Sequence, residues 1–146
     1  MTTDAITGYI NACADALAAA GYTITAANAW LTDWPLTGQI ELDGPIAARP
    51  GSRRHPVLSW TEEYGWNAGF VHPDRITDGI QGRRYADIGV APTPERLTQW
   101  YRAWEHMPDV LGAGSPTLYR QAPDEEMTQE SGEIYRILAE YAGGDE

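Results

Sequence analysis

The sequence predicts an α+β domain in which helices pack on one face of an antiparallel sheet of four or five strands. Residues 4–20 carry apolar side chains at spacings of three and four, which is typical of an amphipathic helix. Residues 57–70 alternate apolar and polar side chains on either side of an acidic stretch, which is typical of a β-hairpin. A second helical stripe begins at Pro94. Helices at both ends of a run of strands favour helices gathered on one face of the sheet.

The first helix and the two strands after it follow from local signals. Gly21 suits the end of the helix, because glycine adopts left-handed backbone conformations at low cost. Residues 22–26 alternate apolar residues with threonine, which predicts a strand that continues through Trp30. Residues 35–38 read as a turn, and residues 39–43 predict the second strand.

The hairpin at residues 57–70 is the clearest element of the chain. Its side chains predicted to face the core are Leu58, Trp60, Trp66, Ala68 and Phe70. Because successive residues of a strand point to opposite faces, this spacing gives one buried and one solvent-facing side. A long loop at residues 44–56 precedes the hairpin, and a fifth strand is predicted at residues 84–90.

The segment Pro-Thr-Pro-Glu at residues 92–95 marks the start of the next helix, because threonine can cap it and proline suits its first position. Its predicted apolar stripe is Leu97, Trp100, Tyr101 and Trp104, and Pro108 ends it. We expect a domain at residues 1–111, a linker at 112–123, and an acidic C-terminal helix within 124–146. That helix belongs to the same domain or forms an appendage.

The charge of the chain is strongly negative. All ten basic residues are arginine, and the net charge is −11. Eight acids and one arginine follow Pro123, so most of the negative charge lies at the C-terminal end. Such a chain repels nucleic acid and anionic membranes, so neither is an expected partner. The absence of lysine indicates a GC-rich genome, which points to an actinobacterium or to one of its phages or plasmids.

The cysteine content and the distribution of apolar residues bear on the cellular compartment of the protein. Cys13 is the only cysteine, so neither an intramolecular disulfide nor a thiolate metal cluster can form. It lies on the apolar stripe of the first helix, where we expect a buried thiol. No signal peptide and no apolar run of membrane-spanning length is visible, which favours a cytoplasmic location.

The candidate binding residues are polar clusters and aromatic residues near turns. They are Arg49, Arg53, Arg54 and His55 in the 44–56 loop, Trp30 and Trp34 beside a turn, and Glu62 and Glu63 at the hairpin tip. The arginine-rich loop suits a phosphate or an acidic partner, or it pairs with the protein's own acids. The glutamate pair could serve acid–base chemistry, but a solvated turn is the simpler interpretation. We expect no catalytic residue, no metal and no cofactor.

The hairpin also carries a resemblance to known proteins. The segment Leu58-Ser59-Trp60-Thr61-Glu62-Glu63-Tyr64-Gly65-Trp66, after a helix that ends Ala20-Gly21-Tyr22, resembles small actinobacterial proteins of unknown function. The Pro-Thr-Pro motif before the second helix matches as well. The same hairpin is similar to parts of actinobacterial immunity proteins, which are acidic and bind toxins. Neither resemblance supplies a catalytic residue.

These observations favour a non-enzymatic protein-binding module with an accessory or regulatory role. A phage or mobile element is the expected source, and an immunity protein or inhibitor of a basic protein is a special case. The first alternative is a small-ligand binder or enzyme that uses the arginine-rich 44–56 loop with Glu62 or Glu63. The second alternative is a structural subunit of a homo-oligomer.

Overall fold

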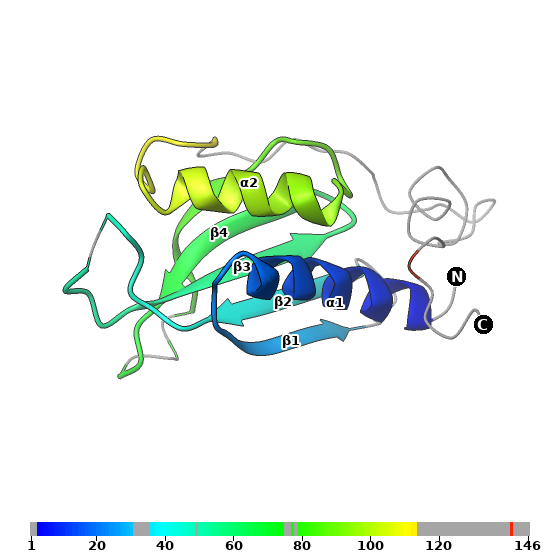
Figure 1. The fold of residues 1–146 in the computed structure, drawn as a ribbon, viewed down its shortest axis with the longest axis horizontal. Coiled ribbons are helices and arrows are strands. Elements are labelled where there is room, and N and C mark those ends of the chain that lie inside the picture. Colours follow the sequence, from blue (N-terminus) through cyan, green and yellow to red (C-terminus); the bar gives the residue numbers. More distant parts are fainter. Residues whose placement is uncertain are drawn as a thin grey trace.

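The computed structural model describes residues 3–30, 36–48, 50–74, 77, 79–113 and 141 (Figure 1). Its elements in chain order are α1 (Thr3–Ala19), β1 (Ile24–Trp30), β2 (Thr37–Leu42), β3 (His55–Thr61), β4 (Gly65–Val71), β5 (Gln81–Tyr85) and α2 (Pro94–Trp104). This is the predicted α+β fold with an antiparallel sheet of five strands.

The sheet is a simple meander. The spatial order is β1-β2-β3-β4-β5, and each strand runs antiparallel to the one before it. Both helices lie over the same face of the sheet (Figure 1). Helix α1 contacts β1, β2 and α2. The opposite face carries neither α1 nor α2, and it is called the open face below.

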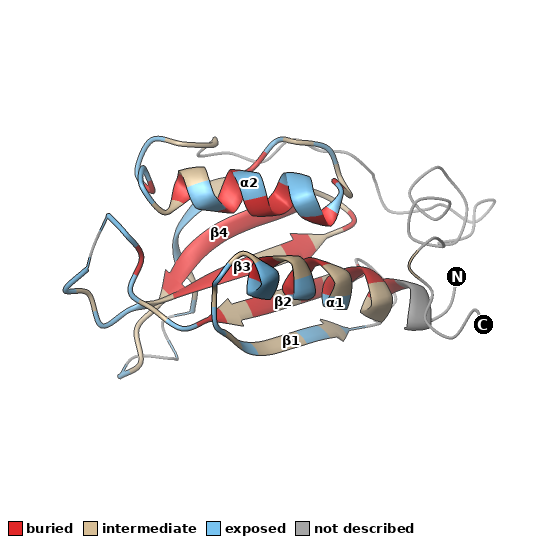
Figure 2. Ribbon diagram, viewed as in Figure 1, coloured by how far each residue is buried: buried red, intermediate tan, exposed pale blue. Residues whose placement is uncertain are grey.

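The core fills the space between the helices and the sheet, where the inner sides of both helices and the length of β4 are buried (Figure 2). The strand register aligns Ile40, Leu58 and Ala68 across three neighbouring strands. Trp60 and Trp66 form the adjacent cross-strand pair, and both are almost fully buried. Aromatic side chains bury large apolar areas, so this pair contributes much of the stabilisation of the layer.

Hydrogen bonds satisfy the polar atoms that Tyr9, Trp60 and Trp66 bring into the core, whereas Trp104 Nε1 is buried without a partner among the described residues. The Tyr9 hydroxyl donates to the carbonyl of Pro92 at 2.6 Å and accepts from Trp66 Nε1 at 3.1 Å. Trp60 Nε1 donates to the carbonyl of Val90 at 2.6 Å. These bonds fasten the connector before α2 to the sheet and to α1. Buried polar groups without such partners would cost stability.

The predicted end of α1 and the predicted start of α2 are confirmed. Gly21 has φ of 107°, a left-handed conformation that closes α1. The Thr93 side chain accepts from the backbone N–H of Arg96 at 3.2 Å and thereby caps α2, with Pro94 in its first turn. Helix α2 ends at Trp104, before the expected stop at Pro108.

The predicted fifth strand is shifted. It occupies Gln81–Tyr85 rather than residues 84–90. The chain turns after it, because Asp87 and Gly89 both have positive φ and cannot continue a strand. A bulge in the pairing with β4 further hides the alternation of β5. Likewise β3 begins at His55, so the long loop is shorter than predicted.

The predicted linker and acidic helix lie almost entirely outside the described residues. Ala113 pairs with Tyr85 as an isolated bridge beside β5. Tyr141 is the single described residue of the acidic segment, and its ring centroid lies 5.1 Å from that of Tyr9. Among the described residues, no helix is both long and apolar enough to cross a membrane.

Candidate functional site

The open face carries a row of polar side chains that crosses the whole sheet. The register places Asn28 beside Gln39, Gln39 beside Ser59, Ser59 beside Asn67, and Asn67 beside Tyr85. Because directly opposed residues of neighbouring strands have Cβ atoms about 5 Å apart, these side chains form one continuous polar row. It lies on the side of the sheet opposite the helices, where Asn28 is exposed and Asn67 is buried.

A second row lies next to the first and contains the most exposed of the described tryptophans. It runs from Trp30 through Thr37 to Thr61. Trp30 is 45% exposed, whereas Trp60, Trp66, Trp100 and Trp104 are each 7% exposed or less. Trp30 therefore keeps about half of its large apolar surface in water, at the rim of a polar surface.

A depression of about 260 Å³ lies between these rows and the connector before β5. Trp30 forms one side of it, and Ile80 and Arg83 form another. Its floor carries the side chains of Thr37, Gln39, Ser59, Thr61 and Asn67. A concave site with an aromatic wall and a few convergent polar groups is the usual form of a ligand pocket.

The local backbone explains how the connector closes one side of the depression. A Cβ on Gly69 would lie 2.5 Å from Ile80 Cγ2 and 2.9 Å from the carbonyl oxygen of Gln81. Glycine at this position thus permits a close approach between β4 and the residues before β5. Arg83 then reaches over β4, and its Nη1 donates to Asn67 Oδ1 at 2.7 Å.

The polar floor is incompletely satisfied. The Asn67 carbonyl accepts from Arg83, which leaves the Asn67 amide N–H groups as donors. Ser59 Oγ is buried and has no hydrogen-bond partner within the described part of the chain. A buried hydroxyl without a partner costs about 1–3 kcal/mol. Because Ser59 Oγ is shielded from solvent, this cost belongs to the folded protein and does not mark a contact open to a ligand.

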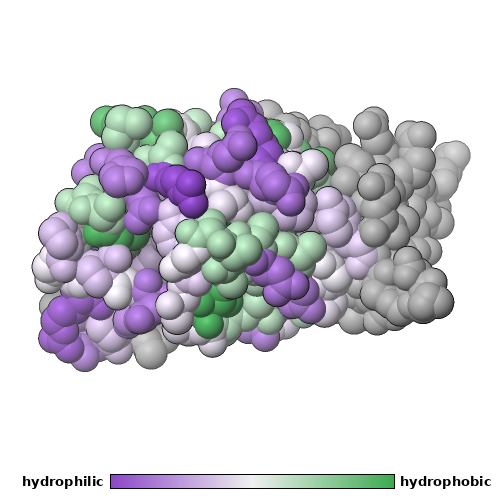
Figure 3. All heavy atoms as spheres, in the orientation of Figure 1, coloured by the Kyte–Doolittle hydropathy of each residue, from purple (hydrophilic) through white to green (hydrophobic). Residues whose placement is uncertain are grey.

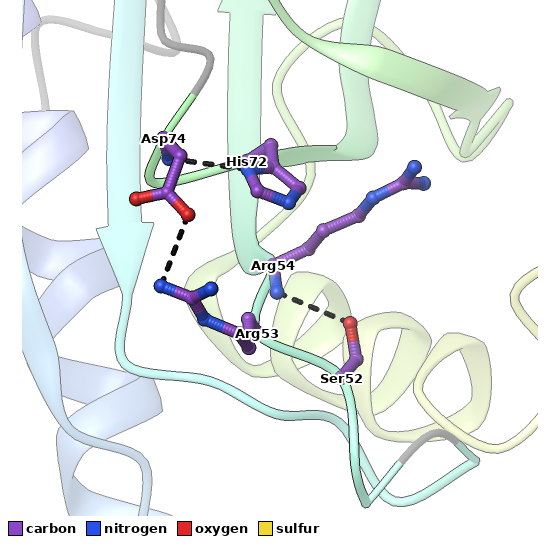
Figure 4. A network of polar contacts seen from close by, with 5 residues as sticks. All are labelled: Ser52, Arg53, Arg54, His72 and Asp74. Atoms are coloured by element: carbon purple, nitrogen blue, oxygen red, sulfur yellow. Dashed lines mark hydrogen bonds and ion pairs between the residues drawn. The ribbon is translucent and has the colours of Figure 1, made fainter.

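The arginine-rich loop lies elsewhere, and Figure 4 shows its polar contacts. Arg53 Nη2 pairs with Asp74 Oδ2 at 3.0 Å, with side chains 70% and 58% exposed. Such an exposed pair contributes little to stability. The Arg54 side chain extends away from Arg53, and its backbone N–H donates to Ser52 Oγ at 3.1 Å. His72 Nδ1 accepts from the backbone N–H of Asp74 at 3.1 Å.

Glu105, which caps the end of α2, anchors the start of this loop. Its Oε1 accepts from the backbone of Ala47 at 3.3 Å, and its carbonyl accepts from Ala48 at 2.9 Å. Its Oε2 accepts from the Tyr22 hydroxyl. The loop is therefore fastened at one end, while Arg53 and Arg54 remain exposed. Arg49 and Trp34, which were also candidates, lie outside the described residues.

The expectation of a solvated turn is wrong for Glu62. Its side chain is fully buried, and Oε1 accepts from the backbone N–H of Leu36 at 2.9 Å. The Glu62 backbone donates in turn to the Leu36 carbonyl at 3.1 Å. The carboxylate thus satisfies a buried N–H group at the entrance to β2. Glu63 is half-buried, and its charge raises the pKa of the Tyr64 hydroxyl.

The proposed joint site of arginines and glutamates is not assembled. His55 begins β3 and Glu62 follows its end, so the length of the strand, roughly 20 Å, separates them. His55 is half-buried and also lies on the open face, at the end of β3 away from Trp30.

Two potentially nucleophilic side chains, Cys13 and Tyr9, are buried in the core. Burial raises the pKa of the Cys13 thiol to about 12, which keeps it protonated and unreactive at neutral pH. Burial likewise raises the pKa of the Tyr9 hydroxyl above its usual range. Within the described part of the chain, no three His, Cys, Asp or Glu side chains come close enough to hold a metal ion.

Sequence reasoning missed the polar row of the open face. It concentrated on charged and aromatic residues and passed over Gln39, Ser59 and Asn67. Their signal was present, because they occupy the solvent-side positions of the predicted strands. Which of these positions fall next to one another depends on the register, and strand periodicity alone does not fix it.

Comparison with known proteins identifies one family. A model of a family of unknown function, DUF6292, matches residues 9–103, which is more than half of the chain. The matched segment contains β1 to β5, most of both helices, and every residue that lines the depression. No curated protein and no solved structure matches the chain.

Proposed function

We propose that this chain, which belongs to the DUF6292 family, is a non-catalytic binding module that recognises a partner protein through its open face. The observation that carries the proposal is the 45% exposure of Trp30 on a sheet face that neither described helix covers. Exposed tryptophan is costly in an isolated protein and is strongly enriched among the residues that dominate binding energy.

The surroundings of Trp30 support the same role. The polar rows beside it supply hydroxyl and amide groups that can both donate and accept hydrogen bonds. An aromatic anchor flanked by uncharged polar groups is the usual composition of a recognition surface. On the side that carries the helices, hydrophilic and hydrophobic residues are interspersed (Figure 3).

The charge of the chain indicates the kind of partner. With a net charge of −11, the protein attracts basic surfaces over long distances and repels acidic ones. We therefore propose a partner with a basic surface, whose association is accelerated by electrostatic steering and slowed by salt. An inhibitor or immunity protein of a basic target is one such role. A cytoplasmic setting and an origin in actinobacteria, or in their phages or mobile elements, belong to this proposal.

Site-specific photo-crosslinking tests the surface directly. A photoreactive amino acid replaces Asn28, which is exposed on the open face, or Gln99, which is exposed on α2. We expect the probe at position 28 to capture a basic protein in the native host and the probe at position 99 to capture none. Trp30→Ala in the first protein should abolish the capture. Equal capture from both positions, or capture only of a second copy of this chain, would contradict the proposal.

A further inference from the structure

We propose that the depression beside Trp30 binds a single hydroxyl-rich sugar ring. The site lies on the open face, where Trp30 stands on one side and Arg83 on another, with polar side chains between them. The inference goes beyond the protein-binding role and does not depend on it. Where both roles hold, the sugar and the protein partner compete for Trp30.

The chemistry of the floor selects an uncharged polar ligand. Gln39, Ser59 and Asn67 come from three adjacent strands and line the same space, to which Gln39 and Asn67 contribute amide groups. Arg83 is the single formally charged residue among the described residues that line the depression, and it already donates to Asn67. A strongly charged ligand would therefore find little compensation for its desolvation.

The free hydrogen-bonding capacity of the floor matches ring hydroxyls. The Asn67 amide retains its donors after accepting from Arg83, and the partly exposed Gln39 side chain bonds no other described residue. Sugar hydroxyls both donate and accept, so they can satisfy such mixed groups without a fixed charge.

The Trp30 side of the depression suits the apolar face of a sugar ring. One face of a pyranose ring consists largely of C–H groups, which pack against an aromatic surface. The half-exposed Trp30 provides such a surface next to the polar floor. The volume of about 260 Å³ lies just below the usual range for drug-sized ligands, which favours one ring over a nucleotide or an oligosaccharide.

Saturation-transfer NMR on the intact protein tests the inference. The probes are glucose, galactose, mannose and N-acetylglucosamine, with adenosine as a flat-ring comparison. We expect transfer to at least one of the four sugars and weaker or no transfer to adenosine. Trp30→Ala should weaken sugar binding roughly tenfold, and Gln39→Ala about fivefold.

A matched control separates the depression from the rest of the face. Asn28 belongs to the same polar row as Gln39 but does not line the depression. Asn28→Ala should therefore leave sugar binding unchanged, and its thermal unfolding serves as the folding reference for the other variants. The absence of transfer to all four sugars, stronger transfer to adenosine, or equal effects of Asn28→Ala and Gln39→Ala would each overturn the inference. None of these outcomes bears on capture of a protein partner.

Discussion

Replacing Tyr9 by phenylalanine removes one hydroxyl from the centre of the core. That hydroxyl donates to the Pro92 carbonyl at 2.6 Å and accepts from Trp66 Nε1 at 3.1 Å. The phenyl ring still fills the space of the phenol, so the change creates little cavity. It removes two hydrogen bonds and leaves one acceptor and one donor without their partner. Each such loss costs about 1–3 kcal/mol, so we expect the free energy of unfolding to fall by about 2–6 kcal/mol.

Urea denaturation measures this loss. The midpoint should fall while the slope of the transition stays constant, because the surface exposed on unfolding is unchanged. Tyr101→Phe is the matched control, since Tyr101 is buried and its hydroxyl bonds no other described residue. We expect the control to cost less than about 0.5 kcal/mol. A Tyr9→Phe variant as stable as the control would refute the view that this hydroxyl joins α1, β4 and the connector before α2.

Three further substitutions test other parts of the structure by the same urea assay. Glu62→Ala should cost about 1–3 kcal/mol because it leaves a buried backbone N–H without its acceptor, whereas Glu63→Ala should cost under about 0.5 kcal/mol; equal costs would contradict the buried role of Glu62. Gly69→Ala should cost about 1–3 kcal/mol because its Cβ would meet Ile80 Cγ2 at 2.5 Å, whereas nothing lies within 4 Å of a Cβ on Gly51; the same stability for both alanine variants would argue against the close packing of β4 and β5. Burial raises the pKa of Cys13 from 9.0 to about 12, so the thiol loses its proton in the unfolded state first as the pH rises. Between pH 9 and pH 12 this residue should therefore lower the free energy of unfolding by at most about 1.4 kcal/mol per pH unit. Cys13→Ala should show a shallower decline of stability with pH, and a decline as steep as that of the unmodified protein would exclude this contribution.

Much of the fold was predictable because its signals are local. The strands of the hairpin required only the two-residue period of their apolar side chains, and the structure confirms both strands and the burial of the residues predicted to face the core. The predicted solvent-facing side is wrong for β4, which is buried on both faces from Gly65 to Phe70 because Ile80 and Arg83 lie over it. The cap of α2 required only the Pro-Thr-Pro-Glu segment. The shift of β5 could not be predicted, because its bulge and the positive φ of Asp87 depend on contacts with β4 and with residues 110–113.

The candidate site was less accessible to prediction, because its geometry arises from contacts between distant residues. The burial of Glu62 depends on a backbone N–H that lies 26 positions earlier in the chain. The polar row of the open face depends on the register of five strands, which no short segment encodes. Trp30 was identified as a candidate from its place beside a turn. Its solvent exposure follows from the helices covering the other face.

The central claim is that Trp30 anchors a partner on the open face, and the affinity of the captured basic protein for two variants tests it most directly. Trp30→Ala removes the exposed indole, and Met107→Ala removes a side chain of similar exposure, 47%, beyond the end of α2. We predict that Trp30→Ala weakens binding about thirtyfold or more, as expected for a dominant interface residue, while Met107→Ala leaves the affinity unchanged. Unchanged affinity in Trp30→Ala, or an equal loss in both variants, would contradict the account.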